Sequence, residues 1–396
     1  MVYREVTSID NNARKLFPYS KLDPHFISAN DIRTTDEYSV EAVRARDLIV
    51  PERFDLIAKI LYVKAYIEQQ GLPWAIELYK DSINAMTGGS FKEGGSETKN
   101  TFNAYVEEFN MLIQCIGLDG FDRETSLVPL GANGEIFDGA HRVAATAFFD
   151  QTIDVIRFSD RSPALSYDYK YLRGNLMSDI NMSIMARYYA EIKDDCFIIC
   201  LLPTKQDEDT RDIIDLIHNS CKIVYEQSLY LTKHGFAGFM SRYAAADDVN
   251  AMMYDRRSSM RVFLCESVQG VGNRPIDETI SDIMFDGADS LLFITDSPSV
   301  DAILELLSDR SQADRLNYPG TPGFIKPLYS RLVVPRQYRS SVLEKMHNDQ
   351  LRRGMYSLGT SDYTEYRKIL RDERHAKLKR WLTVMKSGTY LRLNLL

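Results

Sequence analysis

The fold is decided by the stretch Val128-Pro129-Leu130-Gly131-Ala132-Asn133-Gly134-Glu135-Ile136-Phe137-Asp138-Gly139-Ala140-His141-Arg142-Val143-Ala144-Ala145-Thr146-Ala147. Its apolar start predicts a short strand, and Asn133-Gly134 predicts a tight turn that leads into a second short strand. The alanine-rich end predicts a helix. An acid, a glycine, a histidine and an arginine lie between strand and helix, so we expect any reaction centre here.

The start of this helix predicts an anion-binding site. Its first N–H groups have no intrahelical partner, and the helix dipole favours a negative charge there. Gly139 and Ala140 allow close approach of a ligand, while His141 and Arg142 can add charge-assisted hydrogen bonds to a phosphate. Asp138 can cap the helix, hold His141 in one tautomer, or carry a magnesium ion. The alternative is a capped helix with a surface His-Arg pair.

A second candidate group lies on a helix predicted to begin after Pro51. In the functional hypothesis Asp55 is a general base, and Arg53 or Lys59 binds a phosphate. The alternative is a solvated salt bridge between Asp55 and Lys59, which their spacing of four residues favours.

The remaining pattern predicts an α/β protein of several parts. Residues 1–175 form the first domain with a helical insertion, although residues 1 to about 50 look extended. Residues 190–310 alternate apolar strands with helices and predict a second α/β domain. A Pro/Gly-rich linker at 317–330 leads to a basic, helical tail at 331–396.

Individual elements are predicted by periodicity and apolar runs. Helices are expected at about 53–66, 74–86 and 101–116. In the second domain, strands are expected at 196–202, 222–229, 260–265 and 290–294, with helices at 210–219, 232–243, 276–285 and 300–307. In the tail, helices are expected at 338–353 and 363–385.

Charge is unevenly distributed along the chain. The net charge is −8, which disfavours bulk nucleic-acid binding. From Arg331 onward there are 15 basic and 6 acidic residues, whereas the first 330 residues hold 33 basic and 50 acidic ones. The basic tail can therefore dock on the acidic body, on a partner or on an anionic membrane surface, and an oligomer is compatible with the pattern.

Cysteines and hydropathy indicate a cytoplasmic protein. The start of the sequence does not resemble a signal peptide, and no apolar run approaches the roughly 18 residues of a spanning helix. Five cysteines lie mostly in apolar runs, which favours buried thiols. They form no C-x-x-C pair, so a structural zinc has little support.

The segment Phe137-Asp138-Gly139-Ala140-His141-Arg142-Val143-Ala144-Ala145 resembles the helix-start motif of the ParB/sulfiredoxin-like fold. This superfamily includes chromosome-partitioning CTPases, sulfiredoxins and free-serine kinases with an Asp-Gly-His-His-Arg-type variant. The resemblance implies an α+β N-terminal domain that holds a nucleotide phosphate at the helix start.

Departures from the family motif indicate which branch of the superfamily this chain resembles most. Ala140 stands where sulfiredoxins have a reactive cysteine, so the reductase activity is not expected. Partition proteins have a Gly-Glu-Arg-type box followed by a helix-turn-helix, whereas an acidic α/β region follows here. The small-molecule kinase branch is the nearest in residue chemistry. The arrangement also resembles uncharacterised proteins of bacterial surface-polysaccharide gene clusters, in which a helix like Arg53-Phe54-Asp55 with Lys59 and Tyr62 precedes the Asp-Gly-Ala-His-Arg unit.

These observations predict a nucleotide-dependent phosphotransferase that acts on a small hydroxylated substrate, such as a sugar or sugar-phosphate. ATP or CTP and Mg²⁺ are the expected cofactors. Asp138, His141 and Asp55 are the candidate catalytic residues, with Asp138 also as metal ligand. The phosphate is expected on Gly139, Ala140, His141, Arg142, Arg53 and Lys59. The alternatives are a nucleotide-gated binding or scaffold protein without phosphate transfer, and a non-enzymatic assembly protein.

Overall fold

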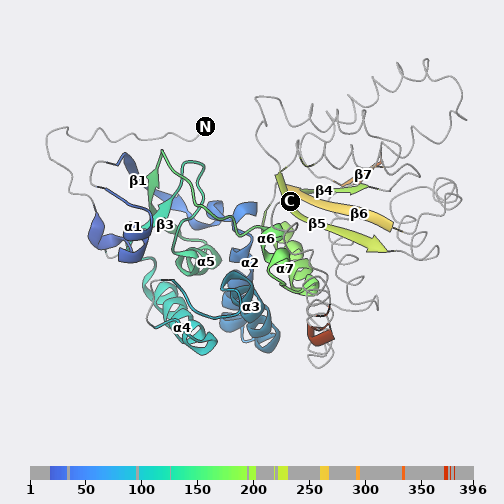
Figure 1. The fold of residues 1–396 in the computed structure, drawn as a ribbon, viewed down its shortest axis with the longest axis horizontal. Coiled ribbons are helices and arrows are strands. Elements are labelled where there is room, and N and C mark those ends of the chain that lie inside the picture. Colours follow the sequence, from blue (N-terminus) through green and yellow to red (C-terminus); the bar gives the residue numbers. More distant parts are fainter. Residues whose placement is uncertain are drawn as a thin grey trace, which may run out of the picture. The chain divides into compact units, whose positions relative to one another are not determined.

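The chain combines helices and strands, as the sequence predicts (Figure 1). The computed structural model describes residues 18–33, 36–94, 98–124, 126–193, 196–201, 218, 222–230, 259–266, 291–294, 332–334, 370–372, 375 and 379. Contacts divide the chain into two units. Unit 1 comprises Met1–Leu48 and Lys92–Leu165, and unit 2 comprises Ile49–Phe91 and Ser166–Leu396. The segment Ile49–Phe91, which the sequence assigned to the first domain, is thus grouped with unit 2.

Unit 1 is built on a three-stranded sheet with the order β1-β3-β2. Its elements are η1 (Tyr19–Lys21), α1 (Pro24–Ala29), β1 (Tyr38–Arg44), η2 (Ala45–Leu48), α4 (Phe102–Asp119), β2 (Val128–Leu130), α5 (Ala140–Phe148) and β3 (Thr152–Phe158). Strands β1 and β3 are antiparallel, and β2 is parallel to β3. Parallel neighbours need a crossover connection, and α5 supplies it.

Local sequence explains the helices of unit 1. The Thr101 hydroxyl accepts a hydrogen bond from the Ala104 N–H at 3.3 Å and so caps α4, as expected for a threonine before an apolar stripe. Small buried residues from Val143 to Ala147 let α5 pack closely within the unit. Helix α1 was not predicted. The Asp23 carboxylate caps it by accepting the N–H groups of His25 and Phe26, and Pro24 occupies its first turn.

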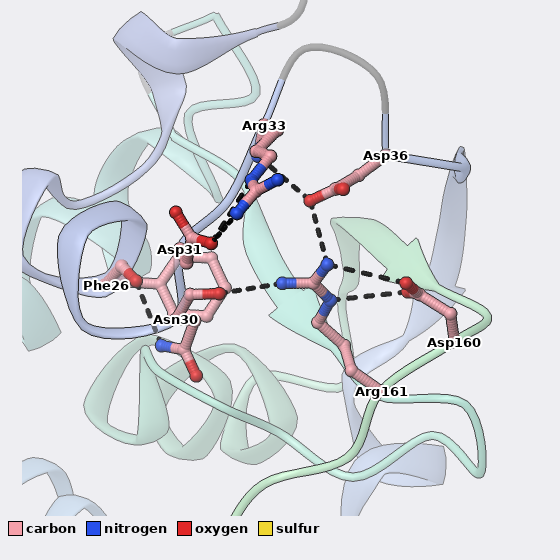
Figure 2. Close-up of polar contacts among 7 residues, drawn as sticks. All are labelled: Phe26, Asn30, Asp31, Arg33, Asp36, Asp160 and Arg161. Atoms are coloured by element: carbon pink, nitrogen blue, oxygen red, sulfur yellow. Dashed lines mark hydrogen bonds and ion pairs between the residues drawn. The ribbon is translucent and has the colours of Figure 1, made fainter.

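A polar cluster around Arg161 holds three segments of unit 1 together (Figure 2). The guanidinium donates to the Asn30 carbonyl at 2.7 Å and to the Asp36 carboxylate at 2.9 Å. It also contacts the carboxylate of its neighbour Asp160. The Arg161 carbonyl accepts the Ala132 N–H at 2.8 Å. Arg161 therefore fixes both the segment after α1 and the turn that precedes α5.

We expect Arg161→Gln to loosen the segment after α1 and to lower the free energy of unfolding by about 1–2 kcal/mol, because the charged hydrogen bonds of the guanidinium are lost at a site that is only partly buried. Hydrogen exchange measured by mass spectrometry should accelerate in residues 26–33, whereas residues 129–137 should keep their protection, because the Ala132 N–H binds the main-chain carbonyl of residue 161. The matched control is Arg33→Gln, since the Arg33 side chain is 67% exposed and pairs with Asp31. Equal protection from hydrogen exchange in the Arg161→Gln and Arg33→Gln variants would show that Arg161 does not hold the segment after α1.

Unit 2 combines helices with a five-stranded sheet of order β5-β6-β4-β7-β8. Its elements are η3 (Pro51–Arg53), α2 (Asp55–Glu68), α3 (Leu72–Met86), α6 (Tyr169–Gly174), α7 (Asp179–Ile192), β4 (Cys196–Leu201), β5 (Lys222–Tyr230), β6 (Ser259–Glu266), β7 (Leu291–Ile294) and β8 (Leu332–Val334). Neighbouring strands are antiparallel, apart from the parallel pair β7 and β8.

Helix α2 lies in the core of unit 2. Ten of its 14 residues are buried, which is typical of a helix that is covered on all sides. Phe54, just before it, contacts the rings of Tyr189 on α7 and Tyr225 on β5. The buried Asp81 carboxylate of α3 accepts hydrogen bonds from the Ser178 N–H and hydroxyl and from Asn181, at 2.6–2.9 Å. The Asp81 carboxylate thereby provides a hydrogen-bond acceptor for the donors at the start of α7.

The predicted elements are only partly within the described residues. The four strands expected in the second domain are confirmed as β4, β5, β6 and β7. Strand β8 lies in the segment described as a basic, helical tail, before the first helix expected there at 338–353, and its apolar Leu-Val-Val run joins the sheet. The helices expected between the strands, the linker at 317–330 and most of the tail lie outside the described residues, although His218 and residues 370–372 are helical.

The burial of the cysteines and the hydropathy of the helices can also be compared with the sequence predictions. Cys196 and Cys265 are buried as expected, whereas Cys115 is exposed on α4. Within the part of the chain that the structure describes, no helix has the length and apolar character needed to cross a membrane.

Candidate functional site

The chain reaches the helix start through a tight reversal. After β2, the Gly131 N–H donates to the Glu135 carbonyl at 2.8 Å, and the Phe137 N–H donates to the Pro129 carbonyl at 3.0 Å. The turn on Asn133-Gly134 is present, with Gly134 at φ = +87°. The second short strand is reduced to a single bridge between Leu130 and Ile136.

Helix α5 begins at Ala140, and no side chain caps it. Gly139 takes the N-cap position with φ = +87°, in the left-handed region that glycine adopts without strain. The capping role considered for Asp138 is therefore not the one observed. Its carboxylate instead accepts a hydrogen bond from Arg142 Nη2 at 3.1 Å.

The Arg142 side chain folds back over the start of its own helix. Its Nη1 donates to the Ser126 hydroxyl and to the Leu127 carbonyl, the latter at 3.3 Å. The guanidinium lies so close to Gly139 that a Cβ there would come within 2.7 Å of Nη2. A cation at the positive end of a helix is unfavourable by itself, so this position requires a nearby anion. In the structure the Asp138 carboxylate supplies it.

The contacts to Ser126 and Leu127 were not predicted from the sequence. Ser126 lies 16 residues before Arg142 and precedes a strand, so no periodic spacing links the two. The Asp138–Arg142 ion pair has the i,i+4 spacing of a helical pair and could have been found by that signal.

His141 packs against α4. Its imidazole contacts the Phe109 ring edge to face, with a centroid distance of 4.8 Å, and lies 6.1 Å from the Tyr105 ring. The side chain is half-buried, which leaves part of it accessible to a ligand. The structure thus brings Asp138 and Arg142 together and places His141 next to Arg142 on the first turn of α5.

The second predicted group forms a buried ion cluster in unit 2. The Asp55 carboxylate accepts hydrogen bonds from Arg53 Nε at 2.9 Å, from Arg53 Nη2 at 3.1 Å and from Lys59 Nζ at 2.6 Å. All three residues are at most 3% exposed. The salt bridge between Asp55 and Lys59 is therefore present, but the prediction that it is solvated is wrong. The Arg53 guanidinium also lies over the Tyr167 ring, 5.3 Å from its centroid.

The electrostatics of this cluster favour a permanently charged carboxylate. Burial alone would raise the pKa of the Asp55 carboxyl. The charges and hydrogen bonds of Arg53 and Lys59 outweigh burial and hold that pKa well below its usual range. Such a carboxylate is a weak base, and the geometry therefore favours a structural role for Asp55. Phosphate binding by Arg53 and Lys59 stays a prediction.

Metal binding has limited support from the protein alone. Among the described residues, no group of three or more His, Cys, Asp or Glu side chains is arranged to hold a metal ion. Asp138 offers one carboxylate, and Mg²⁺ commonly binds one or two carboxylates together with substrate phosphates. The residues at the helix start therefore fit a magnesium ion that arrives with a nucleotide.

Comparisons with known proteins do not extend this description. No protein-family model matches the chain, and no significant match is found among curated proteins or solved structures.

Proposed function

We propose that the start of α5 binds a nucleotide phosphate and that the protein transfers a phosphoryl group to a small hydroxylated substrate, such as a sugar or sugar-phosphate of surface-polysaccharide biosynthesis. The observation that carries this proposal is the position of Arg142, whose guanidinium lies over Gly139 at the uncapped start of the helix. A guanidinium beside the backbone N–H groups of a helix start has the donors that a phosphate requires.

The ion pair with Asp138 suggests how the site changes when a ligand binds. A phosphate can replace the carboxylate as the anion on Arg142, because both accept hydrogen bonds from a guanidinium. Asp138 would then be released at the moment the phosphate binds. Its carboxylate can accept the proton of the substrate hydroxyl while that oxygen bonds to phosphorus and the bond to the leaving phosphate breaks. A magnesium ion held by Asp138 and the phosphates would neutralise charge.

The fold assignment belongs to the same proposal. A strand, a Gly-rich turn, an Asp-Gly-Ala-His-Arg helix start and a parallel strand form one βαβ unit in unit 1. This order supports membership of the ParB/sulfiredoxin-like fold, and the motif supports its small-molecule kinase branch.

The proposal is tested by thermal unfolding with ATP, ADP or CTP and Mg²⁺. At a hundredfold excess over Kd, a nucleotide should stabilise the protein by about 2.7 kcal/mol. Arg142→Ala should remove this stabilisation, because the guanidinium is lost. Arg44→Ala is the matched control, since Arg44 also pairs with an aspartate of unit 1 but is 59% exposed.

Two outcomes would contradict nucleotide binding at this site: no stabilisation of the wild type by any nucleotide, or equal stabilisation of Arg142→Ala. Phosphate transfer is then measured from γ-labelled nucleotide to a panel of sugars, sugar-phosphates and amino acids. Stabilisation without transfer would favour a nucleotide-gated binding protein. The engagement of the Asp138 carboxylate by Arg142 is the observation that supports this second candidate.

A further inference from the structure

A second charged cluster surrounds Glu226 on β5, in unit 2. The Glu226 side chain is almost fully buried, and both of its carboxylate oxygens are engaged. Oε2 accepts the Tyr169 hydroxyl at 3.1 Å and contacts His218 Nε2 at 3.1 Å. Oε1 pairs with Arg261 Nη2 of β6 at 3.1 Å. One buried carboxylate thus fixes side chains from three separate segments.

Helix α6 adds two more cations to this cluster. Arg173 donates to the Glu226 carbonyl, and its guanidinium lies over the rings of Tyr169 and Tyr225, 5.3 and 5.4 Å from their centroids. Lys170 Nζ lies over the Tyr169 ring at 5.9 Å, and its side chain is exposed. Asp168, the nearby acid on this helix, accepts the Tyr171 N–H and caps α6.

The charge around His218 is net positive within the described residues. Lys170 and Arg261 both act electrostatically on its imidazole, against the single carboxylate of Glu226. Burial and the Lys170 charge lower the pKa of His218, and Glu226 only partly opposes them. The site is also accessible, because the side chains of His218 and Arg261 are 25% and 37% exposed.

We propose that Lys170, His218 and Arg261 form an anion-binding site that takes a phosphate group, and that Glu226 holds His218 and Arg261 in place. Arginine has five N–H donors, and its contact with Glu226 uses Nη2, so other donors can face a ligand. Lysine and arginine are the side chains that proteins use most for phosphate. The site lies in unit 2 and is independent of the start of α5.

Binding of inorganic [³²P]phosphate to the full chain tests this site by equilibrium dialysis at constant ionic strength. Arg142→Ala should still bind phosphate, because the α5 site is removed and this one is intact. Adding Lys170→Gln and Arg261→Gln should weaken that binding by at least about tenfold, the equivalent of one charged hydrogen bond. Lys64→Gln is the matched control, since the Lys64 ammonium also lies over a tyrosine ring, 5.4 Å from the Tyr188 centroid.

A measurement on the unaltered cluster covers the case in which the double substitution disturbs folding. Proton NMR follows the imidazole of His218, assigned by comparison with His218→Gln, in phosphate and in chloride. A bound phosphate should raise the pKa of His218, because its negative charge offsets the positive charges of Lys170 and Arg261 and favours the protonated imidazole. An unchanged His218 titration, or full phosphate binding by the Lys170/Arg261 variant, would overturn the proposal. Nucleotide stabilisation that depends on Arg142 is a separate result, so each proposal can fail alone.

Discussion

Asp55→Ala is expected to lower the free energy of unfolding of unit 2 by roughly 3–5 kcal/mol, because removal of one member of a buried ion cluster leaves the charges of the others uncompensated. Asp55 accepts three hydrogen bonds from Arg53 and Lys59 within the core around α2. Truncation removes that shared anion and retains both buried cations.

Urea unfolding followed by Trp74 fluorescence measures this effect. Trp74 is on α3, which packs against α2, and a Trp381→Phe background removes the other tryptophan. The matched control is Glu68→Ala, an exposed acid at the end of α2, for which a change within about 0.5 kcal/mol is expected. A loss below about 1 kcal/mol for Asp55→Ala would show that the cluster is not a buried, coupled unit.

The same carboxylate has a defined pH dependence. Its pKa is depressed in the folded protein, so its stabilising contribution is complete above the ordinary value near 4 and declines as the pH falls further. The wild type should therefore lose stability more steeply than Asp55→Asn below about pH 4.

Stability alone does not explain why a core keeps three charges. Replacement of a whole buried ion cluster by apolar residues of similar size is often neutral or stabilising, by up to about 4 kcal/mol. The triple variant Arg53→Met/Asp55→Leu/Lys59→Met should accordingly fold with stability similar to the wild type. If that variant is folded but has lost phosphate transfer, the cluster serves the reaction. If transfer is unchanged, its role is structural.

The fold was predictable where one local signal dominates. Thr101 marks the start of α4, and apolar runs mark β4 and β6, because capping and burial act on neighbouring residues. Strand β8 is three residues long and is defined by its pairing with β7, which no local pattern encodes.

In the candidate site, too, locally encoded features were predictable and features that depend on tertiary contacts were not. The positive end of a helix and its Asp-Gly-Ala-His-Arg start follow from the sequence. The fold-back of Arg142 onto Ser126 depends on tertiary contact and does not. The spacing of four residues between Asp55 and Lys59 is also that of a solvated pair, so it does not indicate burial, whereas the apolar character of α2 on all its sides does.

Gly139→Ala is expected to abolish nucleotide stabilisation as completely as Arg142→Ala, although it removes no functional group. The added methyl would lie 2.7 Å from Arg142 Nη2 and 3.0 Å from Nε, so the guanidinium must leave the helix start. The alanine must also adopt φ = +87°, which costs about 1–2 kcal/mol for a residue with a Cβ. Thermal unfolding with and without nucleotide and Mg²⁺ measures both effects.

Gly134→Ala separates backbone strain from displacement of the guanidinium. Gly134 has the same φ of +87° in the preceding turn, but a methyl there would lie 3.4 Å from its nearest neighbour, Arg157 Nη1. Both variants should therefore lose stability through backbone strain in the absence of ligand. Gly139→Ala should lose more, because Arg142 also leaves Asp138 and Ser126, and only Gly139→Ala should lose the nucleotide response. If Gly134→Ala loses that response equally, general disturbance of the turn explains the result. If Gly139→Ala retains it, the position of Arg142 over the helix start is not what binds the phosphate.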